Sequence, residues 1–314
     1  MSIERNTQPP LCVGIGEVLW DVLPSGKALG GAPVNVTAHA VQLGMRGAAV
    51  SAVGNDSDGL EILRRLQTMG VDVSDVQVRH DLPTGMVDVA LDMAGVPTFT
   101  IRAPAAWDAV EMNASLTMLA DRADAVIYGS LAQRDPRSRK SIQAFLDATN
   151  VGCLKVFDVN LRHPFYDMEI IRDSLKQADV VKLNDTELQV LAGLLGLKGD
   201  EDALLYALLT GFDLDVLVYT RGAKGSRMLT ADRVEEHPGC LTKVVDTVGA
   251  GDAFTATVTA GLLQGMDLSI IQDLANKVGA FVCSQAGAVP YLPEELTEVF
   301  LGVMQEHNTD MGVK

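Results

Sequence analysis

The sequence predicts an α/β fold in which helices cover a mostly parallel β-sheet. Short apolar runs typical of strands alternate with longer amphipathic segments typical of helices. The composition, with 47% hydrophobic, 21% charged and only 5% aromatic residues, is also typical of a soluble α/β protein. In chain order, the predicted strands are residues 11–16, 48–53, 125–128, 154–159, 180–183 and 216–219.

The first predicted strand ends in Gly14, Ile15 and Gly16, which suggests the start of a dinucleotide-binding fingerprint. That fingerprint needs a third glycine where Leu19 stands, and Pro24 follows before a helix can form. No Gly-x-x-x-x-Gly-Lys-Ser/Thr string occurs either. A nicotinamide oxidoreductase is therefore disfavoured, and a P-loop kinase is excluded.

A glycine pair, Gly30 and Gly31, opens the first predicted helix, which ends near Gly44. Glycines allow the backbone to approach a ligand closely. Asn35 supplies an amide that both donates and accepts hydrogen bonds, which suits a polyol. The alternative is an ordinary glycine turn with a capping Asn.

One region interrupts the alternation of strands and helices. Two strand-like runs, residues 85–91 and 97–102, are joined by turn residues and predict a β-hairpin. We expect this hairpin, completed by residues 17–23, to form a small β lid over the α/β core. The chain is accordingly predicted to be a single domain, residues 1–314, whose lid comes from about residues 17–28 and 84–103.

The fourth predicted strand leads into Asp158, Asn160 and Arg162. If the strand continues, alternation places these side chains on one face. That face would lie at the carboxyl edge of the sheet, where open α/β proteins bind their ligands. The alternative is a salt-bridged strand end.

Polar segments also follow the fifth and sixth predicted strands. Asn184 and Glu187 have the spacing of a helix capping box. The string from Thr220 through Gly222 to Gly225 offers backbone donors and two cations to a nucleotide. Its alternative is an ordinary glycine hairpin turn.

The string Asp-Thr-Val-Gly-Ala-Gly-Asp at residues 246–252 runs directly into an apolar helical segment. Gly249, Ala250 and Gly251 can turn the chain so that backbone N–H groups point outward at the helix start, where the helix dipole favours a phosphate. Asp252 falls within the first turn, close enough to accept a proton from a hydroxyl that attacks a bound phosphoryl group. A carboxylate beside an anion cradle predicts a kinase, with a helix cap as the alternative.

Charge and composition exclude several other classes. The formal net charge of −16 argues against nucleic acid or an anionic membrane as partner, because both need a basic face. No apolar run approaches the ~20 residues of a membrane span, and the polar residues 1–10 lack the core of a signal peptide. We therefore expect a cytoplasmic protein. The four scattered cysteines predict reduced, buried thiols, and the five dispersed histidines predict no transition-metal site.

The strings at residues 30–35 and 246–252 together resemble the signatures of the ribokinase-like (PfkB) family of sugar and nucleoside kinases, with fructokinases the most similar members. The resemblance implies a three-layer α/β/α core with a small β-sheet lid over the sugar. It also implies an ATP-dependent, Mg²⁺-requiring kinase acting on a primary hydroxyl of a small carbohydrate. D-fructose is the preferred substrate, with 2-keto-3-deoxygluconate and ribose as alternatives.

The same resemblance assigns the catalytic and sugar-binding residues. Asp252 is the expected base, while Gly249, Ala250 and Gly251 stabilise the charge on the transferred group. Phe99 would face a neutral sugar ring, whereas Arg102 would suit the carboxylate of a sugar acid. The residues expected at the sugar are Asp21, which alone would be more typical of a turn, Gly31, Asn35, Phe99, Arg162 and Asp252.

Nucleotide and metal sites also follow from the resemblance. Glu187 is expected to hold water around Mg²⁺, with the capping box as its alternative. Asp246 is a candidate ligand for a monovalent cation such as K⁺. The expected nucleotide-binding residues are Asn184, Thr220, Gly222, Gly225 and, beside adenine, Asn276.

The expected partners are a small sugar, ATP and a second copy of the chain bound through the lid edges. The non-enzyme alternative is a sugar or nucleotide sensor on the same fold. The intact Asp252 and both glycine strings disfavour it.

Overall fold

The computed structural model describes residues 8–24, 26–91 and 97–309 of the chain. Most of the polar start, residues 1–7, and the segment predicted to be the hairpin turn, residues 92–96, lie outside the described residues. The side chain of Phe99 lies outside them as well.

The larger sheet is built from the strands β1 Leu11–Ile15, β4 Arg46–Gly54, β5 Val71–Asp72, β6 Val76–Arg79, β9 Ala125–Tyr128, β10 Leu154–Asp158, β11 Val180–Asn184, β12 Val216–Thr220, β13 Ser226–Leu229 and β14 Val234–His237. Within the described residues, their order is β14-β13-β12-β11-β10-β9-β1-β4-β5, with β6 paired to β4. All pairs from β12 to β5 are parallel, and β13 and β14 are antiparallel additions at one edge. All the strands predicted for the core are present, with small shifts at their ends.

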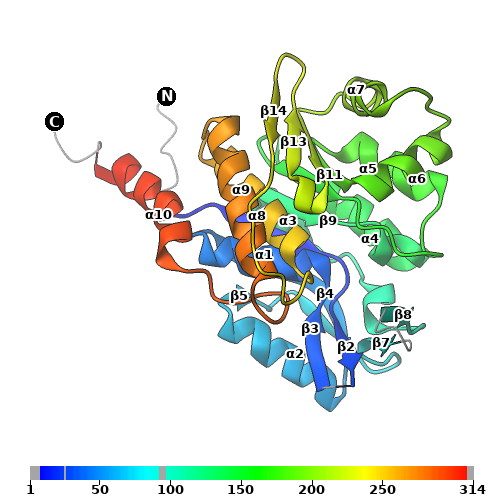
Figure 1. The fold of residues 1–314 in the computed structure, drawn as a ribbon. Coiled ribbons are helices and arrows are strands. Elements are labelled where there is room, and N and C mark those ends of the chain that lie inside the picture. The colour runs from blue at the N-terminus through cyan, green and yellow to red at the C-terminus, as the bar shows by residue number, and fades with distance from the viewer. Residues whose placement is uncertain (1–7, 25, 92–96, 310–314) are drawn as a thin grey trace.

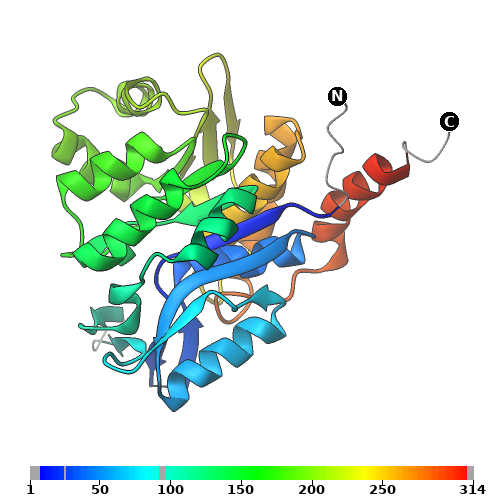
Figure 2. The same ribbon diagram turned by 180° about the vertical axis from the view of Figure 1, so that it is seen from behind.

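Helices cover both faces of this sheet, as the two opposite views show (Figures 1 and 2). One layer contains α3 Ala114–Arg122, α4 Pro136–Asp147, α5 Met168–Gln177, α6 Asp185–Leu195 and α7 Glu201–Gly211. The other contains α1 Ala32–Gln42, α8 Ala250–Leu263, α9 Leu268–Cys283 and α10 Glu294–Thr309. Alternate strand residues serve the two layers: Val13 and Ile15 pack with the first, and Cys12 packs with the second.

A separate four-stranded sheet has the order β3-β2-β7-β8, formed by β2 Leu19–Leu23, β3 Gly26–Gly30, β7 Gly85–Leu91 and β8 Pro97–Ile101. Trp20 anchors it to α2 Ser57–Thr68, because its indole N–H donates to the Asp58 carbonyl oxygen at 3.1 Å. Together the layers and this sheet confirm the predicted three-layer α/β/α core with a small β-sheet lid.

Two details differ from the expectations. Residues 26–30 form strand β3, although the sequence there, Gly-Lys-Ala-Leu-Gly, has little strand propensity and Gly30 was expected to open a helix. Pairing with β2 supplies the missing stabilisation. Of the four free cysteines, Cys12 and Cys153 are buried as expected, whereas Cys240 and Cys283 are only half-buried.

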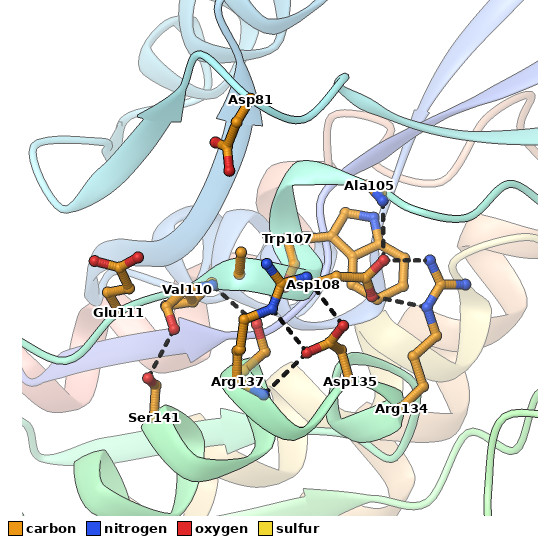
Figure 3. A network of polar contacts seen from close by, with 12 residues as sticks. Asp81, Ala105, Trp107, Asp108, Val110, Glu111, Arg134, Asp135, Arg137 and Ser141 are labelled. Carbon is orange, nitrogen blue, oxygen red and sulfur yellow. Dashed lines mark hydrogen bonds and ion pairs between the residues drawn. The ribbon is translucent and has the colours of Figure 1, made fainter.

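A buried ion pair joins the base of the lid to the core (Figure 3). The Arg134 guanidinium donates to both carboxylate oxygens of Asp108 at 2.8 Å and to the carbonyl oxygen of Arg102, just after β8, at 3.0 Å. The same guanidinium lies over the rings of Trp107 and Phe165, at 4.0 and 4.7 Å from their centroids. This contact fixes the end of the lid strand against the loop that carries Arg162.

Candidate active site

The starts of α1 and α8 differ from those of most other helices in the described structure. A side-chain oxygen of Asp or Asn caps the first turn of α2, α3, α4, α5, α6, α7 and α9. Helices α1 and α8 begin instead at Gly31 and Gly249, with no side-chain hydrogen bond to the cap in either described turn. The cap residue itself therefore supplies no side-chain acceptor to the first turn of either helix.

Both glycines are required by their surroundings. Gly249 has φ 79°, and a Cβ atom there would collide with the carbonyl oxygen of Ala288. Gly31 has φ 120°, and a Cβ atom there would collide with the carbonyl oxygen of Glu17. Glycine at each helix start consequently lets another backbone segment pack directly against it.

The two glycine strings meet through their side chains. Asn35 in α1 donates from Nδ2 to Oδ2 of Asp252 in α8 at 2.8 Å. Asp252 is thus a first-turn residue held by Asn35 and not the cap of its own helix, which rules out the capping alternative. Residues 217 positions apart in the chain share one site.

The electrostatic setting of Asp252 suits a base. Burial and the negative charge of Asp158 raise its pKa to about 6, while the hydrogen bond from Asn35 and the charges of Lys182 and Arg162 oppose that rise. The group is therefore ionised at neutral pH. Its proton affinity is nevertheless closer to that needed for accepting a proton from a hydroxyl.

Asp158 and Arg162 do not share a face, contrary to the expected alternation. Strand β10 ends at Asp158, and Asn160 has φ 39°, so the chain turns instead of continuing as a strand. Asp158 is buried, Asn160 is half-buried and Arg162 is exposed. The alternative of a salt-bridged strand end is correct for Asp158, which pairs with Lys182 at 3.1 Å.

Arg162 nevertheless acts on the site through its charge. It lowers the pKa of Glu17, Asp21 and Asp252, against larger effects of burial that raise all three. The pKa of Asp21, half-buried in lid strand β2, is raised to about 6. The charge of Arg162 therefore reaches both Asp21 in the lid and Asp252 in α8.

Two site residues were not anticipated from the sequence. Glu17, directly after Gly16, is buried, and its carboxylate accepts from the Ala32 N–H at 3.3 Å. Burial raises its pKa to about 7. Lys182 is a buried lysine inside strand β11. Two sequence features could have identified these residues. Glu17 is an acid at the carboxyl end of a predicted strand, and Lys182 is a single charge within an apolar run.

The lid side of the site is only partly described. Phe99 lies in β8 and pairs with Val89 of β7, but its side chain is outside the described residues. Arg102 forms a two-point ion pair with Asp88, at 2.6 and 2.8 Å. Its guanidinium is therefore already matched to a carboxylate.

Glu187 and Asn184 form the capping box at the start of α6. The Asn184 side chain accepts from the Glu187 N–H at 2.9 Å, and the Glu187 carboxylate accepts from the Asn184 N–H at 2.9 Å. The other Glu187 oxygen accepts from the N–H of Leu161 at 3.0 Å. This capping role leaves the proposed contact with Mg²⁺-bound water as a prediction.

The predicted nucleotide residues surround the turn between β12 and β13. Thr220 ends β12, Gly222 begins a short 3₁₀ turn and Gly225 precedes β13, so the hairpin turn given as the alternative is present, and nucleotide binding there stays a prediction. Asn276 lies in α9 and donates to Ser226 Oγ at 2.7 Å. That contact holds α9 against β13, and a role at adenine stays a prediction.

Asp246 contacts residues at the end of α9 and in the loop after it, which are distant in the sequence. Its carboxylate accepts from the N–H groups of Val248 at 3.0 Å and Gly287 at 3.2 Å, and its own N–H donates to the Cys283 carbonyl oxygen at 3.2 Å. The loop after α9 therefore reaches the start of α8. No cluster of at least three His, Cys, Asp or Glu side chains suited to a metal occurs in the described part of the chain.

Among the described helices, none is both long and apolar enough to cross a membrane.

Comparisons with known proteins agree with the predicted resemblance. The chain matches the family described as pfkB family carbohydrate kinase over residues 24–295. A probable fructokinase-5 of Arabidopsis thaliana is 31% identical, and the alignment covers 90% of this chain and 94% of that protein.

Two solved structures extend the comparison. A fructokinase double mutant from Vibrio cholerae, bound to fructose, ADP and a potassium ion, is 27% identical with a TM-score of 0.80, covering 95% of this chain and 100% of that one. An uncharacterized sugar kinase from Pyrococcus horikoshii in complex with ATP is 28% identical with a TM-score of 0.75, and the alignment covers 88% of this chain and 93% of that one.

Proposed function

This chain belongs to the pfkB family of carbohydrate kinases, and on that premise we propose that it is a fructokinase, which transfers the γ-phosphoryl group of ATP to a primary hydroxyl of D-fructose. The observation that carries the proposal is the 2.8 Å hydrogen bond from Asn35 to Asp252 at the uncapped start of α8. It supports a site in which the Asn35 amide would bind the polyol, Asp252 would act as the base and the start of α8 would hold the phosphoryl group.

The proposed transfer is an in-line displacement at phosphorus. The sugar hydroxyl oxygen forms a bond to the γ-phosphorus while its proton passes to the Asp252 carboxylate. The bond between the γ-phosphorus and the oxygen that bridges to the β-phosphorus breaks, and ADP leaves with that oxygen. N–H groups at Gly249, Ala250 and Gly251 stabilise the charge on the phosphoryl oxygens.

The residues present fit a magnesium ion that is bound mainly through phosphate oxygens. Magnesium keeps several of its waters, and the described residues contain no cage of acidic side chains that would strip them. Glu187, beside the loop that carries Arg162, would hold metal-bound water. When bound, the ion neutralises charge on the phosphates of ATP.

The lid favours a neutral sugar over a sugar acid. Arg102 is the residue that would recognise the carboxylate of 2-keto-3-deoxygluconate, and Asp88 already occupies its guanidinium. Asp21 and Asn35 suit the hydroxyls of a neutral polyol. The fructose in the Vibrio cholerae relative supports the same choice.

The test is a substrate panel. Incubation with ATP, Mg²⁺ and D-fructose, 2-keto-3-deoxygluconate, ribose, tagatose or adenosine should release ADP, with the highest kcat/KM for D-fructose. Preference for the sugar acid would replace fructose but keep the kinase mechanism. Binding of sugar without ADP release from any member would favour the silent sensor.

We also infer several properties that accompany this activity. Residues 1–314 act as one kinase domain with a lid at about residues 17–28 and 84–103, and the enzyme works in the cytoplasm. Within the described residues, β3 and β8 are the edge strands of the lid sheet, and such edges suit a homodimer through the lid. Asp246 with the loop after α9 is the candidate potassium site. Light scattering and activity measured with and without K⁺ test the last two.

A further inference from the structure

A charged lysine occupies the interior of the central sheet. Lys182 lies in the middle of β11 with 8% of its surface exposed. An ammonium group in such a position costs several kcal/mol unless it is paired and hydrogen-bonded. The cost of burying the Lys182 ammonium must therefore be offset by its partners.

The partners of Lys182 connect it to the start of α8. Its Nζ donates to both carboxylate oxygens of Asp158, at 3.1 and 3.2 Å. The same carboxylate accepts from the hydroxyl of Thr255, one turn into α8, at 2.8 Å. A Cβ atom on Gly251 would lie 2.9 Å from Nζ, so the ammonium packs directly beneath the anion cradle.

The charges that face Asp252 come from four directions. Asp158 lies on β10 and Lys182 on β11, Arg162 lies in the loop after β10, and Glu17 follows β1. Asn35 on α1 contributes a neutral amide. Arg162 is exposed and therefore screened by water, which leaves Lys182 as the cation that acts through a low dielectric.

We propose that Lys182 is a positioning residue for phosphoryl transfer: it balances Asp158 beneath the cradle and so keeps Asp252 available as an ionised base. This inference rests on the proposed kinase activity. Asp158 and Lys182 form an opposed pair, one discouraging and the other favouring ionisation of Asp252. The pair also ties β10 and β11 to the helix whose first turn holds the phosphoryl group.

The directions of the pKa values agree with this arrangement. Burial works against the ammonium form of Lys182, yet the carboxylates of Asp158, Glu187 and Asp252 raise its pKa overall. Lys182 therefore stays charged at neutral pH. For Asp252, Asp158 raises the pKa and Lys182 lowers it.

The experiment compares the pH dependence of kcat/KM for wild type, Lys182→Met, Asp158→Asn and the double variant. Loss of the ammonium leaves two carboxylates that titrate as a coupled pair, so Lys182→Met should move the acidic limb up by about one pH unit. Asp158→Asn should move it down. The double variant should return close to the wild-type profile, because the opposed charges leave together.

The outcomes separate the two proposals. Asp252→Asn, whose residual rate should lack the acidic limb, assigns that limb to Asp252. If wild type releases no ADP with any sugar, the kinase proposal fails. If wild type is active and the limbs of both single variants coincide with that of wild type, the role of Lys182 fails. Should Lys182→Met not fold, as judged by thermal unfolding, the expected downward shift in Asp158→Asn alone decides the matter.

Discussion

Two neighbouring regions of the site are built in opposite ways. On the proposed phosphoryl-transfer side, formed by Asn35, Asp158, Lys182 and Asp252, buried or half-buried polar groups satisfy one another. The exposed loop, residues 241–248, leads into α8 without regular secondary structure. Its Val244, Val245 and Val248 are 60%, 60% and 44% exposed.

The buried polar groups are preorganised before any ligand binds, whereas the exposed side chains of the loop would become covered only when a ligand binds. Fixed, buried dipoles and charges stabilise developing charge without reorganising during the reaction, which suits the chemical step. Exposed apolar side chains at a loop are instead typical of a ligand-binding surface. We therefore expect substitutions on the phosphoryl-transfer side to lower kcat, and substitutions at the exposed loop to change KM more than kcat.

The largest effect should come from Asp252→Asn. Asn keeps the size of the side chain but cannot accept the proton, so kcat should fall by roughly 10²–10⁴. Affinities for sugar and ATP, measured by calorimetry, should change little, because the base acts mainly in the transition state. A variant that keeps more than about a tenth of wild-type kcat, with chemistry rate-limiting, would show that Asp252 is not the base.

Gly249→Ala and Gly222→Ala compare two glycines with positive φ. Gly222, at φ 55°, has open space around it, so its substitution should cost only about 1–2 kcal/mol of backbone strain. Gly249→Ala adds the collision with Ala288 at the cradle and should cost more stability, along with at least about tenfold in kcat/KM for ATP. Equal losses of stability in urea unfolding would contradict the close contact of Gly249 with Ala288, and an unchanged kcat/KM for ATP in Gly249→Ala would contradict a cradle there.

Glu17→Gln tests, through the pH dependence of stability, whether burial raises the pKa of Glu17. The pKa of Glu17 is raised from 4.5 to about 7, so its stabilising contribution is complete below 4.5 and is lost as pH rises through about 7. Glutamine does not ionise. From about pH 5 to pH 8 the free energy of unfolding should therefore shift by about 2 kcal/mol in favour of the variant. Parallel stability curves would show that Glu17 titrates normally.

Glu187, in the capping box at the start of α6, has a matched pair of variants. Glu187→Gln retains the capping box, whereas Glu187→Ala loses it and should cost about 1 kcal/mol of stability. Both variants should need more Mg²⁺ for half-maximal activity if the carboxylate holds metal-bound water. Unchanged Mg²⁺ dependence in both would leave Glu187 with the capping role alone.

The smallest effect is expected for Arg102→Ala at the rim of the lid. Its ion pair with Asp88 is about half exposed on both sides and contributes at most ~1 kcal/mol to stability. The kcat/KM for D-fructose should change by less than about tenfold, while Arg162→Ala should reduce it further. A large increase in KM for 2-keto-3-deoxygluconate upon Arg102→Ala would instead identify a sugar-acid kinase.

The sequence by itself determined the family, the order of strands and helices, and the two glycine strings. These features are local or periodic: alternating apolar runs specify strands, and glycines with an adjacent Asp specify an unusual helix start. The pairing of residues 26–30 as β3 was missed, because a strand with weak propensity depends on its neighbour.

Only the tertiary structure decided which groups meet at the site. Strand periodicity predicted one face for Asp158, Asn160 and Arg162, but the chain turns after Asp158 and separates them. The ammonium of Lys182 instead comes from the adjacent strand, β11, and Asn35 reaches Asp252 across two helices. A buried charge is tolerated only where partners from distant segments compensate it, so its place is fixed by packing and not by local pattern.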